Sequence, residues 1–277
     1  MEIEEFIIYT RDGLKLHSEH FVAEKPRAVI CLVHGFGEHL GRYHELMKFF
    51  NAENIASLAM DLRGHGKSGG LRGHAPGHSL LMSDIEELLK AARAEYTESP
   101  IFLYGHSLGG GLTLQYILHN NTNELSGFIA SSPWIRLAFE PPKWKEKVGG
   151  LASKIAPRIR LDSNLNIKAL CRDPDVVSAY EEDPLVNLKI SARLYEIAKN
   201  AGTDTLAHSG SLKLPGLLFH GSADQITDHR ATEHFANNHP DDVKFHLLEN
   251  FYHEAHHDPG KENVLHMIRD WVYEMTK

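Results

Sequence analysis

The stretch Ile101–Gly110, with the sequence IFLYGHSLGG, decides the fold. Its apolar start predicts a buried strand, and the amphipathic run Leu108–His119 after it predicts a helix. Between them lies Gly-x-Ser-x-Gly, which in a strand–turn–helix setting is typical of a nucleophile elbow. A chance match in a loop is the alternative, but the flanking strand and helix argue against it. Ser107 is therefore the candidate nucleophile.

Two glycines explain how such a turn is built. A serine at its tip takes a strained positive φ, and side chains two residues away on either side would collide with neighbouring backbone. Gly105 and Gly109 remove these collisions. Ser107 would then present its hydroxyl at the end of the sheet. The N–H groups and dipole of the following helix favour a developing oxyanion there.

Length, charge and cysteine content bound the class of protein. The 277 residues suit one large α/β domain with an insertion, or two small domains. A net charge of −8 argues against nucleic acid as a partner. The acidic start Met1–Glu5 lacks a secretory pattern, and no apolar run approaches the ~18 residues that cross a bilayer. Cys31 and Cys171 form no disulfide framework, so we expect a cytoplasmic protein. A secreted protein without its signal would look the same, and the sequence leaves the oligomeric state open.

Strand-like and helix-like segments alternate along the chain. Two strands flank Arg11-Asp12-Gly13, which is a hairpin signal. The predicted strands are residues 6–9, 14–21, 28–33, 55–60, 101–104, 127–131, 214–220 and 243–248, and the predicted helices lie around 43–50, 85–92, 108–119, 231–237 and 264–275. This order predicts the α/β class, with a mostly parallel central sheet flanked by helices.

The alternation breaks after the strand at 127–131. We expect residues 133–212 to form a helical cap above the serine, because a long insertion that directly follows the strand after the elbow would overhang it. Residues 1–132 and 213–277 would then form the core domain. A few ordinary extra helices are the alternative.

Basic residues gather in the first part of this expected cap. Between residues 133 and 172 they are Arg136, Lys143, Lys145, Lys147, Lys154, Arg158, Arg160, Lys168 and Arg172, opposed by Glu140, Glu146 and Asp162. Nine minus three gives +6 in a chain that totals −8. Apolar and basic residues interleaved on short helices are typical of a surface that contacts lipid, which suggests transient membrane contact. A solvated face is the alternative.

A serine hydroxyl needs a base within hydrogen-bond reach and a carboxylate that orients the base. In this fold the expected order is serine, acid, histidine, with the last two after the final strands. Asp224 follows the last strand but one, and we prefer it to Asp228, which is placed to cap the next helix. His253 is the first histidine after the last strand and the candidate base, ahead of His256 and His257.

The stretch His253–His257 also matches His-Glu-x-x-His, the pattern of zinc metalloproteases. That chemistry needs both outer imidazoles on one face of a continuous helix. Pro259 and Gly260 would break such a helix, and no clear third ligand follows. We therefore expect neither a metal nor an organic cofactor.

An oxyanion hole needs two backbone donors. One would be the N–H of Leu108, and the other that of Phe36 in the turn His34–Glu38. We expect His34 to support this turn by hydrogen bonding. The glycine-rich run Asp61–Ser68 lacks the spacing of a phosphate loop, so we expect a structural turn there.

Together these residues resemble the α/β-hydrolase superfamily, and within it the branch of monoacylglycerol lipases and lysophospholipases. The matching stretches are residues 34–43, 61–68, 105–109, 183–185, 220–224 and 252–253, spread over nearly the whole chain. The run Gly-Glu-His-x-Gly-Arg-Tyr at 37–43 is more specific to this branch than the serine elbow, which is common to the superfamily.

The resemblance implies a serine esterase with a mobile cap and an acyl tunnel. Its triad falls on Ser107, Asp224 and His253, in agreement with the reasoning from the residues. It also implies that Glu38 and Arg42 contact the substrate head group, with an ion pair that holds the turn as the alternative. The expected substrate is a monoacylglycerol or a similar single-chain lipid ester. A lysophospholipase, a general carboxylesterase, a serine peptidase or amidase, and a non-catalytic binding protein are the other hypotheses.

Overall fold

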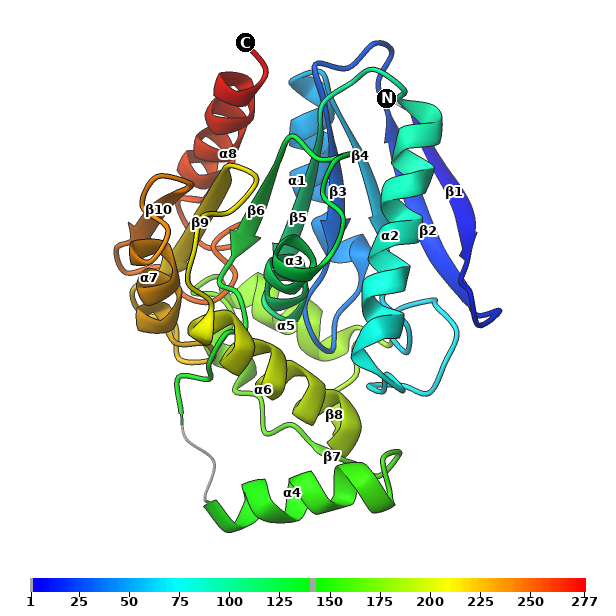
Figure 1. Ribbon diagram of the computed structural model, residues 1–277, viewed down its shortest axis with the longest axis vertical. Coiled ribbons are helices and arrows are strands. Elements are labelled where there is room, and N and C mark those ends of the chain that lie inside the picture. The colour runs from blue at the N-terminus through cyan, green and yellow to red at the C-terminus, as the bar shows by residue number, and fades with distance from the viewer. Residues whose placement is uncertain (1, 140–142) are drawn as a thin grey trace.

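The computed structural model describes residues 2–139 and 143–277, without the side chains of residues 143–148. An eight-stranded sheet lies at its centre, in the order β1-β2-β4-β3-β5-β6-β9-β10 (Figure 1). These strands are β1 (Glu2–Tyr9), β2 (Lys15–Val22), β3 (Ala28–Val33), β4 (Ile55–Met60), β5 (Ile101–His106), β6 (Gly127–Ser131), β9 (Gly216–Gly221) and β10 (Val243–Leu248). From β4 to β10 all neighbours are parallel, and β2 and β1 extend the edge in antiparallel fashion. The predicted α/β class and mostly parallel sheet are confirmed.

Helices cover both faces of this sheet, which is why its central strands are apolar throughout. All six residues of β3 are buried. Val29, Cys31 and Val33 face one hydrophobic cluster with α2 and α3, whereas the residues between them face a second cluster with α1 and α8. This is the two-residue period of a strand buried on both sides. The core helices are α1 (His44–Ala52), α2 (His78–Glu95), α3 (Leu108–His119), α7 (His229–Asn237) and α8 (Lys261–Met275), with the short 3-10 helix η1 (Leu40–Tyr43) before α1.

The first strand is longer than the sequence pattern predicts. It begins at Glu2 instead of residue 6, and it pairs with β2 over its whole length, from Glu2 opposite Val22 to Tyr9 opposite Lys15. Acidic residues fit here because an antiparallel edge strand keeps one face in water. The apolar pattern therefore predicts only the second half of β1.

The segment between β6 and β9, residues 133–212, is called the inserted segment below. It contains α4 (Lys143–Ile155), β7 (Arg160–Asp162), the 3-10 helix η2 (Ile167–Ala169), α5 (Pro174–Glu182), β8 (Lys189–Ser191) and α6 (Ala192–Ala207). Strands β7 and β8 pair in a separate two-stranded sheet, and α4 lies beyond α6, far from the central sheet (Figure 1). Of the charged residues counted above, Glu140 and the side chains of Lys143, Lys145, Glu146 and Lys147 lie outside the described residues.

Within the part of the chain that the structure describes, no helix combines the length and the apolar character needed to cross a membrane.

Candidate active site

Ser107 lies at the tip of the predicted elbow, between the end of β5 and the start of α3. Its φ of 52° and ψ of −115° are the strained conformation that the motif predicts. A Cβ added at Gly105 would collide with the Gly109 carbonyl, and one added at Gly109 would collide with the Val33 carbonyl. The glycines of the motif are therefore required by close backbone approach, as expected.

The turn after β3 lies directly against this serine. A Cβ at Gly35 would lie 3.1 Å from the Ser107 Cβ, so the turn and the elbow are in contact. Phe36, the next residue, lines the same pocket as Ser107. Leu108 is the first residue of α3, where backbone N–H groups have no partner within the helix. The structure brings both predicted donors beside Ser107, and their role in an oxyanion hole stays a prediction.

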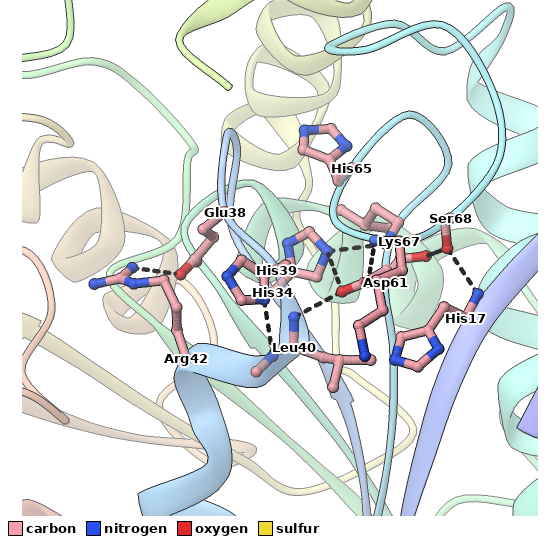
Figure 2. Close-up of polar contacts among 12 residues, drawn as sticks. His17, His34, Glu38, His39, Leu40, Arg42, Asp61, His65, Lys67 and Ser68 are labelled. Carbon is pink, nitrogen blue, oxygen red and sulfur yellow. Dashed lines mark hydrogen bonds and ion pairs between the residues drawn. The ribbon is translucent and has the colours of Figure 1, made fainter. Parts of the chain in front are cut away.

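Buried hydrogen bonds hold this turn in place (Figure 2). The His34 Nδ1–H donates to the Gly35 carbonyl at 2.7 Å, and its Nε2 accepts from the Leu62 N–H at 2.9 Å. Burial lowers the pKa of His34 to about 4, so the ring is neutral and has one donor and one acceptor. The Asp61 carboxylate accepts from the Leu40 N–H at 2.8 Å. The supporting role of His34 and the structural character of the 61–68 turn are both confirmed.

Asp224 and His253 meet at the ends of β9 and β10. The His253 Nδ1–H donates to Asp224 Oδ2 at 2.7 Å, and both side chains are almost fully buried. The competing carboxylate, Asp228, instead caps α7 by accepting from the Arg230 N–H at 2.9 Å and pairs with Arg136 at 2.8 Å. Between the two aspartates, the structure thus brings Asp224 to the predicted base.

Further hydrogen bonds saturate the Asp224 carboxylate. Its Oδ2 also accepts from His220 Nε2 at 2.9 Å and from Thr227 Oγ1 at 3.0 Å. Its Oδ1 accepts from the N–H groups of Ile226 at 2.7 Å and Thr227 at 3.1 Å. No sequence motif assigns His220 or Thr227 to this carboxylate, although His220 of β9 and Thr227 of the following loop are both within four residues of Asp224.

The pKa values of this pair are shifted apart. Burial raises the pKa of Asp224, but the charge of His253 and the hydrogen bonds of His220 and His253 outweigh burial, so the pKa lies well below its ordinary value. Burial lowers the pKa of His253, but Asp224 outweighs it and raises the pKa above its ordinary value. A carboxylate that stays ionised beside an imidazole stabilises the imidazolium that forms during proton transfer.

Ser107 and His253 line one pocket with a volume of about 840 Å³. Because Nδ1–H of His253 donates a hydrogen bond to Asp224, Nε2 is the ring nitrogen that can accept the proton of the serine hydroxyl. Among the described residues, the Ser107 hydroxyl forms no hydrogen bond with this ring. Such bonds are often long in unliganded sites and shorten when substrate binds. The three predicted side chains are brought to one place, and their catalytic roles belong to the proposal below.

Much of the pocket wall comes from the inserted segment. Its apolar members include Trp134, Leu137, Ile159, Leu161, Leu170 and Ile190. Ile159 and Leu161 are also 51% and 66% exposed, so they form part of an apolar rim at the surface. The pocket therefore extends from the candidate serine to an apolar rim at the surface.

Tyr180 of α5 is a polar wall residue that the sequence did not suggest. Its hydroxyl is buried and forms no hydrogen bond with the residues that the structure describes. Its ring packs 4.6 Å below the Arg42 guanidinium. A buried hydroxyl without a partner in a pocket wall is a hydrogen-bonding group available to a ligand.

Glu38 and Arg42 form the ion pair that was the alternative to a head-group contact. Arg42 Nη1 donates to Glu38 Oε2 at 2.6 Å, and the guanidinium also pairs with Glu254. Glu38 and Glu254 line the pocket, whereas Arg42 is not among its described lining residues. The head-group role of Glu38 and Arg42 stays a prediction. Glu254 was missed because its neighbours suggested only the metalloprotease pattern.

The metalloprotease geometry does not form. Residues 253–257 make turns instead of a helix, so their imidazoles do not stand one helical turn apart. In the described part of the chain, one group of side chains lies close enough to share a metal ion, namely Glu5, His17 and Glu19 of the β1–β2 hairpin. None of these three lines the pocket.

Comparisons of this chain with known proteins show the family to which it belongs. Residues 24–260 match the family described as serine aminopeptidase, S33. An uncharacterized abhydrolase domain-containing protein of Dictyostelium discoideum is 34% identical over 90% of the chain, which spans 27% of that protein. A putative monoglyceride lipase of Schizosaccharomyces pombe is 33% identical over 98% of the chain and 72% of its own length. A monoacylglycerol lipase of Mycolicibacterium smegmatis is 31% identical over 89% of the chain and 88% of its own length.

Solved structures agree with the sequence relatives. The monoacylglycerol lipase of Paleococcus ferrophilus superposes with a TM-score of 0.82 and 31% identity, over 94% of this chain and 99% of that one. A soluble variant of monoglyceride lipase from Saccharomyces cerevisiae, in complex with a substrate analog, gives a TM-score of 0.85 and 25% identity, over 100% and 95% of the two chains. The chain therefore belongs to the serine aminopeptidase S33 family of the α/β-hydrolase superfamily, with monoacylglycerol lipases among its relatives.

Proposed function

We propose that this protein hydrolyses the ester bond of monoacylglycerols. The observation that carries the proposal is the pocket of about 840 Å³ in which Ser107 and His253 meet apolar walls. Its volume lies within the range of roughly 300–1,000 Å³ that is usual for a ligand site. The relatives named as monoacylglycerol lipases support the same substrate.

The reaction follows from the positions of the side chains. His253 Nε2 takes the proton of the Ser107 hydroxyl, whose oxygen attacks the ester carbonyl. The N–H groups of Phe36 and Leu108 stabilise the oxyanion of the tetrahedral intermediate. The imidazolium, held by Asp224, returns the proton to the leaving glycerol oxygen and leaves an acyl-enzyme. Water, activated by the same imidazole, then releases the fatty acid and restores the serine.

The polar part of the pocket supports a leaving group that carries hydroxyls. The unpartnered Tyr180 hydroxyl lies in the wall with Glu38 and Glu254. A glycerol hydroxyl is both a donor and an acceptor, so it satisfies such a group. The acyl chain would lie along the apolar wall.

A peptidase is the alternative that the family description names. Recognition of a free amino terminus needs a carboxylate with an open oxygen. Glu38 and Glu254 are both paired with Arg42, and all four of their oxygens accept hydrogen bonds, so neither is an open partner for an amino terminus. The other carboxylate described in the pocket wall, Asp162, is at an exposed position on β7.

The inserted segment would act as a cap that contacts lipid surfaces. Leu151 and Ile155 of α4 are 58% and 74% exposed, so the inserted segment presents them to solvent as well as Ile159 and Leu161. Lys154 lies on the same helix. An apolar face with basic neighbours suits transient binding to the surface of a membrane or micelle, where the substrate lies. We propose a cytoplasmic enzyme that binds such surfaces peripherally.

Product analysis on a substrate panel tests the proposal. The panel contains mono-, di- and triacylglycerols, lysophospholipids, short nitrophenyl esters and aminoacyl anilides. We expect fatty acid release from monoacylglycerol at the highest kcat/KM. Preference for lysophospholipids would show that the proposed substrate is wrong and the proposed ester hydrolysis is right. Cleavage of anilides alone would show that the proposed reaction is wrong.

A further inference from the structure

Arg42 joins two carboxylates that belong to different loops of the site. Its Nη1 donates to Glu38 Oε2 and to Glu254 Oε1, each at 2.6 Å, and its Nη2 donates to Glu254 Oε2 at 2.7 Å. All three side chains are less than a tenth exposed. A bidentate pair fixes the orientation of both partners, because the planar guanidinium fits a carboxylate as a fork.

One end of this network is the oxyanion turn. Glu38 Oε1 accepts from the Gly35 N–H and from the Tyr43 hydroxyl, each at 2.7 Å. The Gly35 N–H belongs to the residue directly before Phe36, whose own N–H is the expected oxyanion donor. Glu38 thus fixes the peptide beside that donor, and its side chain points toward Arg42 (Figure 2).

The other end is the loop that carries the base. Glu254 directly follows His253, and its N–H donates to the Leu170 carbonyl of the inserted segment at 2.8 Å. A continuous series of hydrogen bonds therefore connects the oxyanion turn to the residue beside the imidazole, with Arg42 at its centre. The distance between the oxyanion turn and the His253 loop must be fixed, because the oxyanion donor and the imidazole both have to act on the ester at Ser107.

The charges explain why an arginine is needed at this point. One cation lies between two buried carboxylates, so the group carries a net charge of −1. Burial raises the pKa of Glu254, but the charge and hydrogen bonds of Arg42 outweigh it, and the pKa lies below its ordinary value. Removal of the guanidinium would leave two buried carboxylates face to face, which a buried site tolerates poorly.

We propose that Arg42 is a positioning residue for ester hydrolysis, which sets the separation between the oxyanion turn and the His253 loop through Glu38 and Glu254. This inference rests on the proposed roles of Phe36 and His253. This role differs from a head-group contact. Glu38 and Glu254 line the pocket, whereas Arg42 is not among its described lining residues.

Arg42→Lys tests the proposal, since lysine keeps the charge but cannot form the fork. The assay compares a monoacylglycerol with p-nitrophenyl butyrate, which has no glycerol. Misplacement of reacting groups by about 1 Å can cost about 100-fold, so we expect kcat to fall by 10- to 100-fold on both esters, with KM changed less than about threefold. The rate of labelling by a fluorophosphonate should fall by the same factor.

Arg63→Lys is the matched control. Arg63 is also buried between two carboxylates, with bonds to Asp84 at 2.6 and 2.7 Å and to Asp12 at 3.0 and 3.1 Å, but it does not line the pocket. Both lysine variants should lower the melting temperature. Only Arg42→Lys should lower kcat beyond about twofold, if the effect is positional and not a general loss of stability.

Glu254→Gln gives a second readout that a purely structural role would not change. It removes a negative charge next to His253, and that charge helps to raise the pKa of the imidazole. We expect a smaller loss of kcat on both esters and an acid limb of the pH profile shifted to lower pH. If Arg42→Lys does not fold, this variant decides the question by the same measurements.

Two results would overturn the inference. One is a rise in KM for the monoacylglycerol alone, which would make Arg42 a head-group contact. The other is a loss of kcat no greater than that of Arg63→Lys. A wild-type protein that cleaves the nitrophenyl ester but not the monoacylglycerol would instead overturn the proposed substrate, and the Arg42 comparison would still be decided on the ester and the probe.

Discussion

The loops at the strand ends and the inserted segment are built on opposite principles. The loops after β5, β9 and β10 hold Ser107, Asp224 and His253 in buried positions, and the Asp224 carboxylate accepts five hydrogen bonds. The inserted segment leaves Leu151 and Ile155 in solvent. Reacting groups need fixed positions, whereas a surface for lipid needs apolar side chains that are free to make new contacts. Changes in the strand-end loops should therefore affect every ester, and changes in the inserted segment only lipid esters.

The largest effect should come from Ser107→Ala. Without its nucleophile, the protein keeps only the binding pocket and the oxyanion donors, and kcat should fall on the order of 10⁵-fold on both monoacylglycerol and p-nitrophenyl butyrate. Titration of released fatty acid measures the first, and absorbance the second. Retention of wild-type turnover on either ester would break the assignment of the strand-end loops as the reacting part.

Asp224→Asn should have the next largest effect. The amide cannot stabilise the imidazolium, and it favours the wrong tautomer of His253, so kcat should fall about 10³- to 10⁴-fold with KM little changed. The matched control is Asp228→Asn, which keeps an oxygen that can cap α7, loses only the ion pair with Arg136 and should alter kcat less than about twofold. Equal losses in the two variants would contradict the choice of Asp224.

The pH profile tests the same pair without a large loss of activity. His253 must be neutral to accept the serine proton, and its pKa is raised, so kcat/KM should rise with pH through a midpoint above about 6.5. The raised pKa also means that His253 stabilises the fold at low pH and that this contribution is lost as pH rises through it. The residual activity of Asp224→Asn should show a lower midpoint. An unchanged midpoint would show that Asp224 does not set the pKa of the base.

These strand-end loops were largely predictable, and the inserted segment was not. The elbow, the order of acid and base, and the turn at His34 follow from motifs in which local backbone geometry fixes the chemistry. Glu254 escaped prediction because its contacts with Arg42 join segments that only the folded sheet brings together. His220 and Thr227 are within four residues of Asp224, but no motif indicates that the turn directs them to its carboxylate. In the inserted segment, charge and apolar content indicated a lipid surface, but no periodic pattern indicated β7, β8 or the place of Tyr180.

The double change Leu151→Ser with Ile155→Ser tests the role of the inserted segment. Both side chains are exposed, so the melting temperature should hardly change. Loss of two apolar contacts with a lipid surface should lower activity on vesicle-borne monoacylglycerol about 10-fold. Activity on soluble p-nitrophenyl butyrate should stay within about twofold.

Ile3→Ser with Ile7→Ser is the control for that experiment. These residues of β1 are 40% and 44% exposed and lie on the edge strand, away from the inserted segment. Their replacement should leave vesicle activity unchanged. An equal loss from both double variants would mean that general surface apolarity, and not this segment, governs contact with lipid.

The smallest effect should come from Tyr180→Phe. The ring and its packing on Arg42 are kept, and only the unpartnered hydroxyl is removed. Loss of one hydrogen bond to glycerol should raise KM for monoacylglycerol about three- to tenfold and leave the nitrophenyl ester unaffected. An equal change on both esters would place the hydroxyl outside the head-group end of the pocket.

Peptide mass spectrometry after fluorophosphonate treatment, run beside monoacylglycerol hydrolysis on the same samples, tests whether Ser107 is the nucleophile. We expect one adduct on Ser107 and a loss of fatty acid release in proportion to its formation. Full hydrolysis by protein modified at Ser107, or an adduct on another residue that tracks the loss of activity, would contradict it.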